Sequence, residues 1–310
     1  MGVAAIDVEH LGNPGIICAY LLDTPEPALV DPGPSTSLPR LIDGLSRLGA
    51  QVSDLRHVLL THVHLDHAGG VGHLVRENPR ITVHVHTDGA PHIAEPERLV
   101  SSTRRTFGDE HDRYWGDVLP VPADRIRGWS PGDPPPLEGI RPLPTPGHIA
   151  HHLAWEALGP GILFSGDSLG VVLDPAAPTH PPTPPPAVGL SAWRATIEAV
   201  RDAVEVPTFA ATHFGMHADP QRRAIELGDA LEDLARRVHG AMDLGDDAEA
   251  AAREEFARET LERQGAGREG AGSSSDYFSV FPPRLDWEGM RFHLSRTPAE
   301  RERLASRTSR

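Results

Sequence analysis

Residues 61–70 read THVHLDHAGG and place three histidines and an aspartate within a short stretch of chain. These side chains are His62, His64, Asp66 and His67. Neutral imidazoles and carboxylates are the groups that hold zinc, iron or manganese in proteins. With 18 histidines in the chain, a lone His-x-His motif would mean little. The denser cluster favours a metal site, provided that further ligands exist elsewhere in the sequence.

Three distant residues could supply those ligands, because each follows an apolar strand-like run. His148 lies in PTPGH, Asp167 ends LFSGD, and His213 lies in FAATHFG. The first cluster likewise follows the run RHVLL and is closed by Gly69-Gly70. Each residue alone is also compatible with an ordinary turn or cap. Together they predict several loops at strand ends, which is where α/β proteins bind ligands.

The elements that must position these loops fall into two batches. Strands are predicted at residues 16–22, 27–33, 56–60 and 81–86, and again at 139–148, 151–158, 161–167 and 208–215. Helices are predicted at residues 35–49, 91–116 with a break at Pro96, 191–203 and 220–240. This order indicates two sheets sandwiched between helices. His84 and His86 alternate along one strand and are expected on a partly exposed face.

Two segments differ from this pattern. Residues 174–190, DPAAPTHPPTPPPAVGL, are proline-rich and are either a passive linker or a wall of the site. We expect a core domain at residues 1–240 and an extension at 241–310, with a charged helix, a flexible connector at 265–276 and an aromatic segment after it. The extension could pack on the core, form a homodimer contact or line a pocket.

Composition excludes some classes of protein. The formal net charge is −15, and all 29 basic residues are arginines, without a basic run. Nucleic acid and anionic membranes are therefore not expected as partners. The one cysteine, Cys18, lies in an apolar run and is expected to be a core residue in a reducing compartment. No signal-peptide pattern and no long apolar run is present, so we expect a cytoplasmic protein.

The motifs LVDPG, THVHLDHAGG, TPGH, FSGD and THFG resemble, in this order, those of the metallo-β-lactamase superfamily over roughly residues 10–220. The resemblance implies an α/β fold, a four-layered αββα sandwich with a two-metal site at one edge, here with a C-terminal helical tail. It implies that one metal is bound by His62, His64 and His148, the other by Asp66, His67 and His213, with Asp167 bridging both. Asp31, in LVDPG, is implied as the partner that orients a ligand histidine.

This ligand set implies two divalent metal ions, zinc with iron and manganese as alternatives, that share a hydroxide. The hydroxide would attack the carbonyl of a small-molecule ester, lactone, thioester or amide, and Asp66 would act as the catalytic residue by handling a proton. Residues 88–118 and 174–190 are expected to flank the metals and set the choice of substrate. His152, His217 and the insert residues His111, Tyr114 and Trp115 are weaker candidates for contact with the site.

Differences between this sequence and the motifs of the superfamily's branches indicate which branches it resembles less. The best-known zinc β-lactamases carry a ligand cysteine, whereas the one cysteine here is Cys18. The negative charge disfavours a nuclease. Glyoxalase-II-like thioesterases and acyl-homoserine lactonases share the ligand set, although the lysine that the former use for glutathione has no counterpart here. The alternative to a hydrolase is an iron-dependent redox enzyme of the same fold, similar to persulfide dioxygenases, because the same ligands accept iron.

Overall fold

The computed structural model describes residues 1–266 and 272–308, which form two compact units. The sheet unit comprises Met1–Thr145, His151–Gly166 and Val206–Ala218. The helical unit comprises Pro146–Ala150, Asp167–Glu205 and Asp219–Arg310. Residues on both sides of position 240 therefore belong to the helical unit, and a separate extension at 241–310 stays a prediction.

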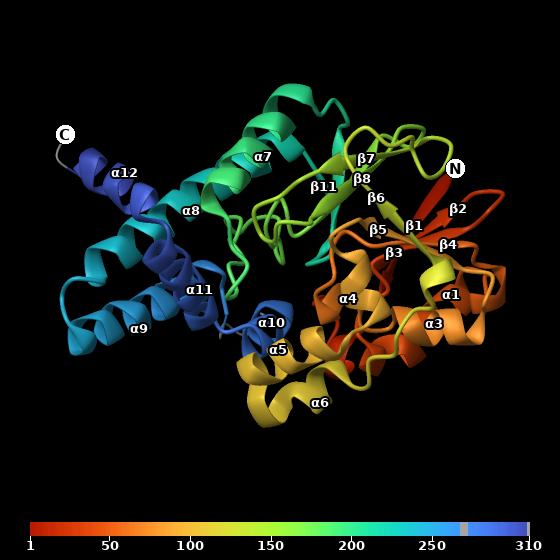
Figure 1. Cartoon of the computed structure of the whole chain (residues 1–310), viewed down its shortest axis with the longest axis horizontal. Coiled ribbons are helices and arrows are strands. Elements are labelled where there is room, and N and C mark those ends of the chain that lie inside the picture. Colours follow the sequence, from red (N-terminus) through yellow and green to blue (C-terminus); the bar gives the residue numbers. More distant parts are fainter. Residues whose placement is uncertain (267–271, 309–310) are drawn as a thin grey trace. The chain divides into compact units, whose positions relative to one another are not determined.

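Both sheets belong to the sheet unit (Figure 1). In spatial order, the first consists of β1 (Gly2–Asp7), β2 (Cys18–Asp23), β3 (Ala28–Val30), β4 (His57–Leu59), β5 (Thr82–His86) and β6 (Ile126–Trp129). The second, again in spatial order, consists of β11 (Gly215–Ala218), β10 (Thr208–Ala211), β9 (Ile162–Gly166), β8 (Leu153–Ala157) and β7 (Ile140–Pro144). Strands β3 to β6 are parallel, and so are β9 and β10. Their carboxyl ends therefore meet at common sheet edges, as the predicted site requires.

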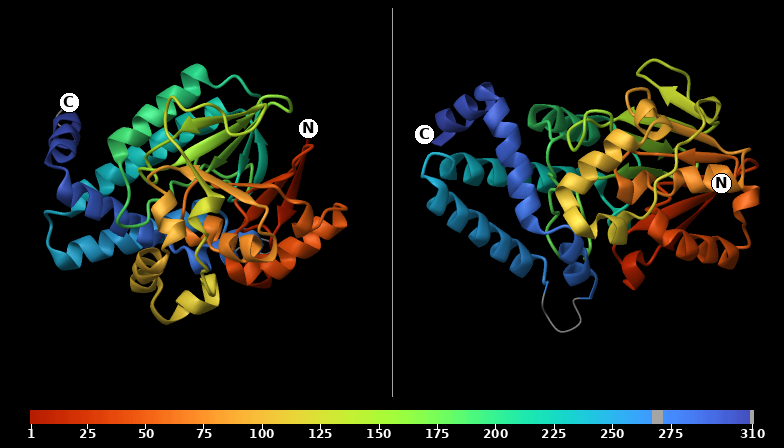
Figure 2. Two further views of the ribbon diagram at one scale, coloured as in Figure 1. Left: turned by 45° about the vertical axis from the view of Figure 1, so that its right-hand side comes forward. Right: turned by 60° about the horizontal axis from the view of Figure 1, so that its bottom comes forward.

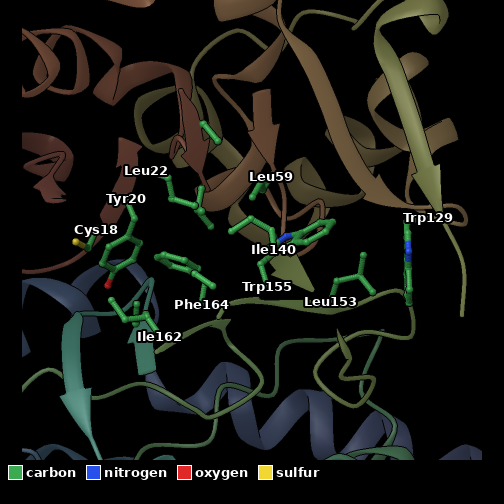
Figure 3. Close-up of a cluster of buried hydrophobic side chains, with 14 residues drawn as sticks. Cys18, Tyr20, Leu22, Leu59, Trp129, Ile140, Leu153, Trp155, Ile162 and Phe164 are labelled. Atoms are coloured by element: carbon green, nitrogen blue, oxygen red, sulfur yellow. The ribbon is translucent and has the colours of Figure 1, made fainter. Parts of the chain in front are cut away.

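The core of the sheet unit is built from alternate residues of strands in both sheets. In the first sheet, Cys18, Tyr20 and Leu22 of β2 face this core. In the second sheet, Trp155 of β8 and Phe164 of β9 face it (Figure 3). Alternation places every second side chain on one face of a strand, so each sheet contributes one apolar face. Burying each large side chain contributes about 1.5–3 kcal/mol, which fixes the register of the strands that carry the site.

Helices of the sheet unit are short. They are α1 (Leu38–Arg47), α2 (Leu65–Ala68), α3 (Val71–Glu77), α4 (Ala90–Ala94), α5 (Glu97–Phe107) and α6 (His111–Trp115). The 3-10 helices are η1 (His10–Gly12), η2 (Ser35–Ser37), η3 (Val52–Asp54), η4 (Gly108–Glu110) and η5 (Ala123–Arg125). The predicted helical insert is thus interrupted at Gly108, whose φ of 56° is left-handed, as well as near Pro96.

The helical unit contains α7 (Leu190–Ala203), α8 (Pro220–Ala241), α9 (Asp246–Arg263), α10 (Gly272–Val280), α11 (Pro283–Arg296) and α12 (Pro298–Thr308). Helix α8 begins where the Asp219 carboxylate accepts a hydrogen bond from the Arg222 backbone, and it buries Leu227, Leu231 and Leu234 at helical spacing. Helices α9 and α11, both blue, lie side by side in both views of Figure 2 and both contact α8. Across residues 1–266 and 272–308, no helix combines the length and apolar character needed to cross a bilayer.

The structure corrects two expectations about local elements. Residues 267–271 of the expected connector lie outside the described residues, but 272–276 begin helix α10. Buried Tyr277, Phe278 and Val280 anchor that helix despite its serine-rich start. His84 is buried rather than partly exposed, because its Nε2 lies 3.0 Å from Nδ1 of His57 on the neighbouring strand. The short strands β1, β6 and β11 and helices α2 and α3 were not predicted.

Burial of His84 makes the stability of the fold depend on pH. Burial lowers the pKa of His84 to about 3, and His57 and Arg127 add to the effect. A histidine that stays neutral in the folded state contributes fully above its unfolded pKa of about 6.5, and the contribution is lost as the pH falls towards the folded value. We expect the free energy of unfolding of the metal-free protein to fall between pH 6.5 and 4, with His84 supplying up to about 1.4 kcal/mol per pH unit.

Urea unfolding of wild type and His84→Gln at several pH values in this window measures the slope. The variant should show a shallower slope, whereas His86→Gln, on the same strand but only partly buried, should keep the wild-type slope. Equal slopes for wild type and His84→Gln would contradict the assignment.

Candidate metal centre

The histidine-rich loop begins where β4 ends and is tied to both sheets. The Leu60 backbone donates a hydrogen bond to the carbonyl of His84 on β5, at 2.9 Å. The carbonyl of Thr61 accepts one from the Leu153 backbone on β8, at 2.8 Å. The loop is therefore held between the two sheets before it reaches His62. It then enters helix α2, which carries Asp66 and His67.

Asp31 lies at the centre of this arrangement. It directly follows β3, Thr61 follows β4 by two residues, and the pairing of Val30 with Leu59 brings them together. The Asp31 Oδ1 accepts a hydrogen bond from the Thr61 backbone at 2.8 Å. Its Oδ2 accepts from Thr61 Oγ1, His67 Nδ1 and Thr212 Oγ1, at 2.7, 2.8 and 2.9 Å. This carboxylate is fully buried, so these hydrogen bonds replace those that it would make with water.

Asp66, His67 and His213 bring their ligand atoms together in the sheet unit. Nδ1 of His67 donates to Asp31, and Nδ1 of His213 donates to the carbonyl of Ile16 at 2.7 Å. In a neutral imidazole the other nitrogen then carries a lone pair. Both Nε2 atoms face the carboxylate of Asp66, at 3.6 Å for His67 and 3.1 Å for His213. Acceptors that converge in this way fit a cation, which relieves their mutual repulsion.

His62 and His64 form a second part of the site in the sheet unit. Thr61 Oγ1 donates to Asp31, so it accepts the Nδ1 proton of His62 at 3.1 Å and leaves the lone pair of that ring on Nε2. That Nε2 lies 3.0 Å from Nδ1 of His64. His152 stacks on the His62 ring with centroids 4.9 Å apart and is held by Thr145 at 2.8 Å. His152 thus packs against a predicted ligand.

His148 and Asp167 are paired within the helical unit. Nε2 of His148 lies 3.4 Å from the Asp167 carboxylate, and Nδ1 donates to the carbonyl of Pro182 at 2.8 Å. The same division of ring nitrogens therefore appears here as in His213. The turn before His148 needs glycine, because a Cβ on Gly147 would overlap the side chain of Trp193. Asp167 is bonded directly to Gly166, the last residue of β9.

Five of the seven predicted ligands thus lie together in the sheet unit, and two lie together in the helical unit. The five are His62, His64, Asp66, His67 and His213, and the two are His148 and Asp167. Asp31 accepts a hydrogen bond from His67, one of the predicted ligands, and its role in orienting a metal ligand stays a prediction. Joint binding of a metal pair by all seven stays a prediction.

Sequence reasoning missed His10, which lies in the loop between β1 and β2. This ring is fully buried, stacks on Trp115 with centroids 5.5 Å apart, and has Nδ1 3.3 Å from Oγ of Ser37. Burial lowers the pKa of His10 to about 4, an effect that Asp66 opposes and His213 strengthens. The ring is therefore neutral at physiological pH. A single histidine outside any motif gives no signal of this position.

The helical insert lies against the same part of the sheet unit. A Cβ on Gly89 would lie 3.2 Å from both Val63 and His151, so the start of the insert approaches the histidine-rich loop. At its far end, Ser35 and Thr36 donate to the carbonyls of Trp115 and Tyr114, each at 2.8 Å. His217, another weak candidate, donates instead to the carbonyl of Phe214. The effect of the insert on substrate choice stays a prediction.

Comparison with known proteins identifies the family. A model of the metallo-beta-lactamase superfamily matches residues 12–210, well over half of the chain. The chain belongs to the metallo-β-lactamase superfamily. This confirms the resemblance inferred from the motifs of the sequence.

Curated relatives of this superfamily member match over part of their length. A hydroxyacylglutathione hydrolase of Methylobacillus flagellatus is 28% identical over 142 residues, which cover 46% of this chain and 42% of that protein. A hydroxyacylglutathione hydrolase-like protein of Homo sapiens is 33% identical over 137 residues, which cover 43% of this chain and 36% of that protein. The chain therefore spans less than half the length of these relatives.

Solved structures support the fold over nearly the whole chain. The archaeal superfamily protein ST1585 from Sulfolobus tokodaii has a TM-score of 0.65 at 18% identity and covers 93% of this chain and 98% of its own. The family protein TTHA1429 from Thermus thermophilus has a TM-score of 0.65 at 23% identity and covers 96% of this chain and 94% of its own. These likenesses confirm the expected α/β class, the αββα fold of the superfamily.

Asp31 offers a test of how this half of the site is held. Asp31→Asn keeps the size of the side chain and suits its left-handed φ of 43°. The amide, however, has one acceptor oxygen and turns hydrogen-bond donors towards buried donors. We expect metal affinity to fall about 10–100-fold and the metal-free protein to lose about 1–3 kcal/mol of stability. Chelator competition and urea unfolding measure the two effects.

Asp124→Asn is the matched control, because that carboxylate is exposed. Wild-type metal affinity in Asp31→Asn would show that His67 needs no carboxylate partner.

Proposed function

We propose that this protein is a metal-dependent hydrolase that cleaves an ester, lactone or thioester of a small molecule at a pair of divalent cations. The supporting observation is the convergence of three possible metal ligands, Asp66, His67 and His213, whose ligand atoms all lie within 4.8 Å of one another. Hydrogen bonds from Nδ1 orient the two imidazoles. Imidazole nitrogens and carboxylate oxygens suit zinc, and iron and manganese are the alternatives.

The proposed metal ligands follow the superfamily pattern. One cation is held by His62, His64 and His148, the other by Asp66, His67 and His213, and Asp167 bridges them. Two features support including His148 and Asp167. His148 presents Nε2 because Pro182 takes its Nδ1 proton, as Ile16 does for His213. Asp167 directly follows β9, whose last residue pairs with Ala211, two residues before His213.

The chemistry follows from what this site offers a substrate. When bound, a pair of divalent cations supplies a hydroxide at neutral pH and polarises a carbonyl group. Asp66 is placed to hold one cation and to handle the proton of the attacking water, because its side chain is about one-tenth exposed while its oxygen faces both imidazoles. Nδ1 of His67 donates to Asp31 and Nδ1 of His213 donates to the carbonyl of Ile16, so Nε2 is the nitrogen that each ring would offer to a cation.

Three classes of carbonyl substrate are considered, namely thioesters, esters and lactones. The relatives named hydroxyacylglutathione hydrolases bring thioesters into consideration. The chain has no lysine that could bind a glutathione carboxylate, so esters and lactones remain equal candidates. A hydrolysis screen over lactones, thioesters and aryl esters, run with metal-replete and metal-depleted protein, tests the proposal. Failure of metal to restore any hydrolysis would reject it.

The bridging role of Asp167 predicts metal stoichiometry. Asp167→Ala removes the carboxylate shared by both cations, so we expect reduced occupancy at both and near-complete loss of hydrolysis. Metal content per chain after dialysis is the measurement. Asp174→Ala, an exposed aspartate in the following loop, should keep two metals. Two tightly held metals in Asp167→Ala would remove this residue as the bridge.

Asp66 separates hydrolysis from redox chemistry. Asp66→Asn should lower kcat by at least about 100-fold with a much smaller change in KM, because proton transfer and hydroxide attack occur in the transition state. The metal held by His62, His64 and His148 should remain. Wild-type turnover should be the same with and without oxygen. Oxygen consumption in step with product would replace the hydrolase proposal by the iron-dependent alternative.

A further inference from the structure

The proline-rich loop orients one of the proposed metal ligands through its backbone. The carbonyl of Pro182 accepts the Nδ1 proton of His148 at 2.8 Å, and both residues are buried. This bond fixes which ring nitrogen carries the lone pair and where it points. A shift of the loop at Pro182 would therefore either rotate the ring of His148 or break the hydrogen bond from its Nδ1.

The part of this loop around Pro182 has few backbone hydrogen-bond donors of its own. Residues 180–186 read HPPTPPP, so only His180 and Thr183 have backbone N–H groups. The N–H of His180 donates to the carbonyl of Val171 at 3.0 Å. The N–H of Thr183 donates to the side chain of Asp286 at 2.6 Å. One of the two available donors, the one next to Pro182, is thus satisfied by helix α11.

Asp286 forms hydrogen bonds with the loop on both sides of Pro182. Besides Thr183, its carboxylate accepts a hydrogen bond from Nε2 of His180 at 2.9 Å. The backbone carbonyl of Asp286 accepts one from Oγ1 of Thr183, also at 2.9 Å. Asp286 is itself 6% exposed, and these hydrogen bonds of a buried residue go to two residues of the loop, His180 and Thr183. Such a charge-assisted set fixes position as well as contributing energy.

Two further residues on the same face of α11 contact the loop. A Cβ on Gly289 would overlap the carbonyl oxygen of Thr183, so only glycine lets the loop backbone lie against the helix there. Nε2 of His293 accepts a hydrogen bond from the Leu190 backbone at 3.4 Å. Residues 286, 289 and 293 are spaced by three and four positions and share one helix face.

Helix α11 can act as a fixed support because it is packed within the helical unit. Trp287, Met290 and Leu294 are fully buried, and the Trp287 ring lies 5.8 Å from that of Phe256 on α9. Contacts with α8 and α9 hold the helix from two directions (Figure 1). Around Thr183 the loop is therefore positioned by a well-packed helix.

We propose that α11 is a positioning element for the metal ligand His148, with Asp286 as the positioning residue and Gly289 as the contact that sets its distance from the loop. This rests on the proposed function only in taking His148 as a ligand. It gives the C-terminal helices a role in the metal site that packing alone would not require.

The first test uses the metal-free full-length protein and needs no catalysis. Proton NMR with ¹⁵N-labelled histidine should show a protected Nδ1–H signal for His148, identified by its loss in His148→Gln. Gly289→Ala and Asp286→Ala should shift or abolish that signal. Gly240→Ala is the matched control, since a Cβ at that helical glycine meets nothing within 4 Å. An unchanged signal in both α11 variants would overturn the proposal.

The second test measures metal binding by the same variants. We expect Gly289→Ala to weaken one of two bound Co²⁺ ions about 10–100-fold and to alter its visible absorption, as loss of a ligand's hydrogen-bonding partner does elsewhere. Asp286→Asn keeps an acceptor for Thr183 and should lie between wild type and Asp286→Ala. If Gly289→Ala does not fold, the ordering of the two Asp286 variants decides. Equal affinity and spectra across all folded variants would overturn the proposal.

The two proposals fail separately. A wild type that binds no metal would reject the proposed hydrolase but leave the NMR test of His148 intact. A wild type that binds two metals and hydrolyses substrate, with the α11 variants unchanged in NMR and Co²⁺ spectra, would reject only the role of α11.

Discussion

One buried carboxylate, that of Asp31, holds together the part of the site that lies in the sheet unit. A charge without solvent is costly, and four donors offset the cost here. Those donors come from the end of β4, from α2 and from the residue after β10. The two sheets and helix α2 are therefore linked through the Asp31 carboxylate. The same bond that satisfies this charge also sets the ring of His67, so fold and site share one interaction.

The second constraint is directional. Nδ1 of His67, of His148 and of His213 each donates a hydrogen bond to a carboxylate or carbonyl oxygen, which leaves Nε2 as the nitrogen that each ring would offer to a cation. If these side chains hold a cation, as proposed, metal binding would also stabilise the folded chain, because the unfolded chain does not bring the ligands together. Ligand geometry here is a property of the surrounding framework more than of the ligands themselves.

The sequence predicted the parts that depend on local pattern. Short apolar runs located strands β2 to β5 and β7 to β10, and polar residues that follow such runs located the candidate ligands. Burial of His84 depends on His57, a partner 27 residues away, and gave no local signal. The sequence could not predict that Ile16 and Pro182 accept hydrogen bonds from His213 and His148. Every residue has a backbone carbonyl, so residue type gives no indication of this role. Helix α10 was missed because its stability comes from packing of Tyr277 and Phe278, against the low helix propensity of glycine and serine.

The use of backbone carbonyls has an evolutionary consequence. A carbonyl oxygen survives any substitution, so the chain at Ile16 and Pro182 orients His213 and His148 whatever side chains those loops carry, provided that the backbone keeps its path. Side chains in these two loops can then change during evolution while His213 and His148 keep their orientation. If these histidines bind metal, as proposed, such a protein could acquire new substrates by side-chain substitutions while the path of its main chain preserves the metal ligands.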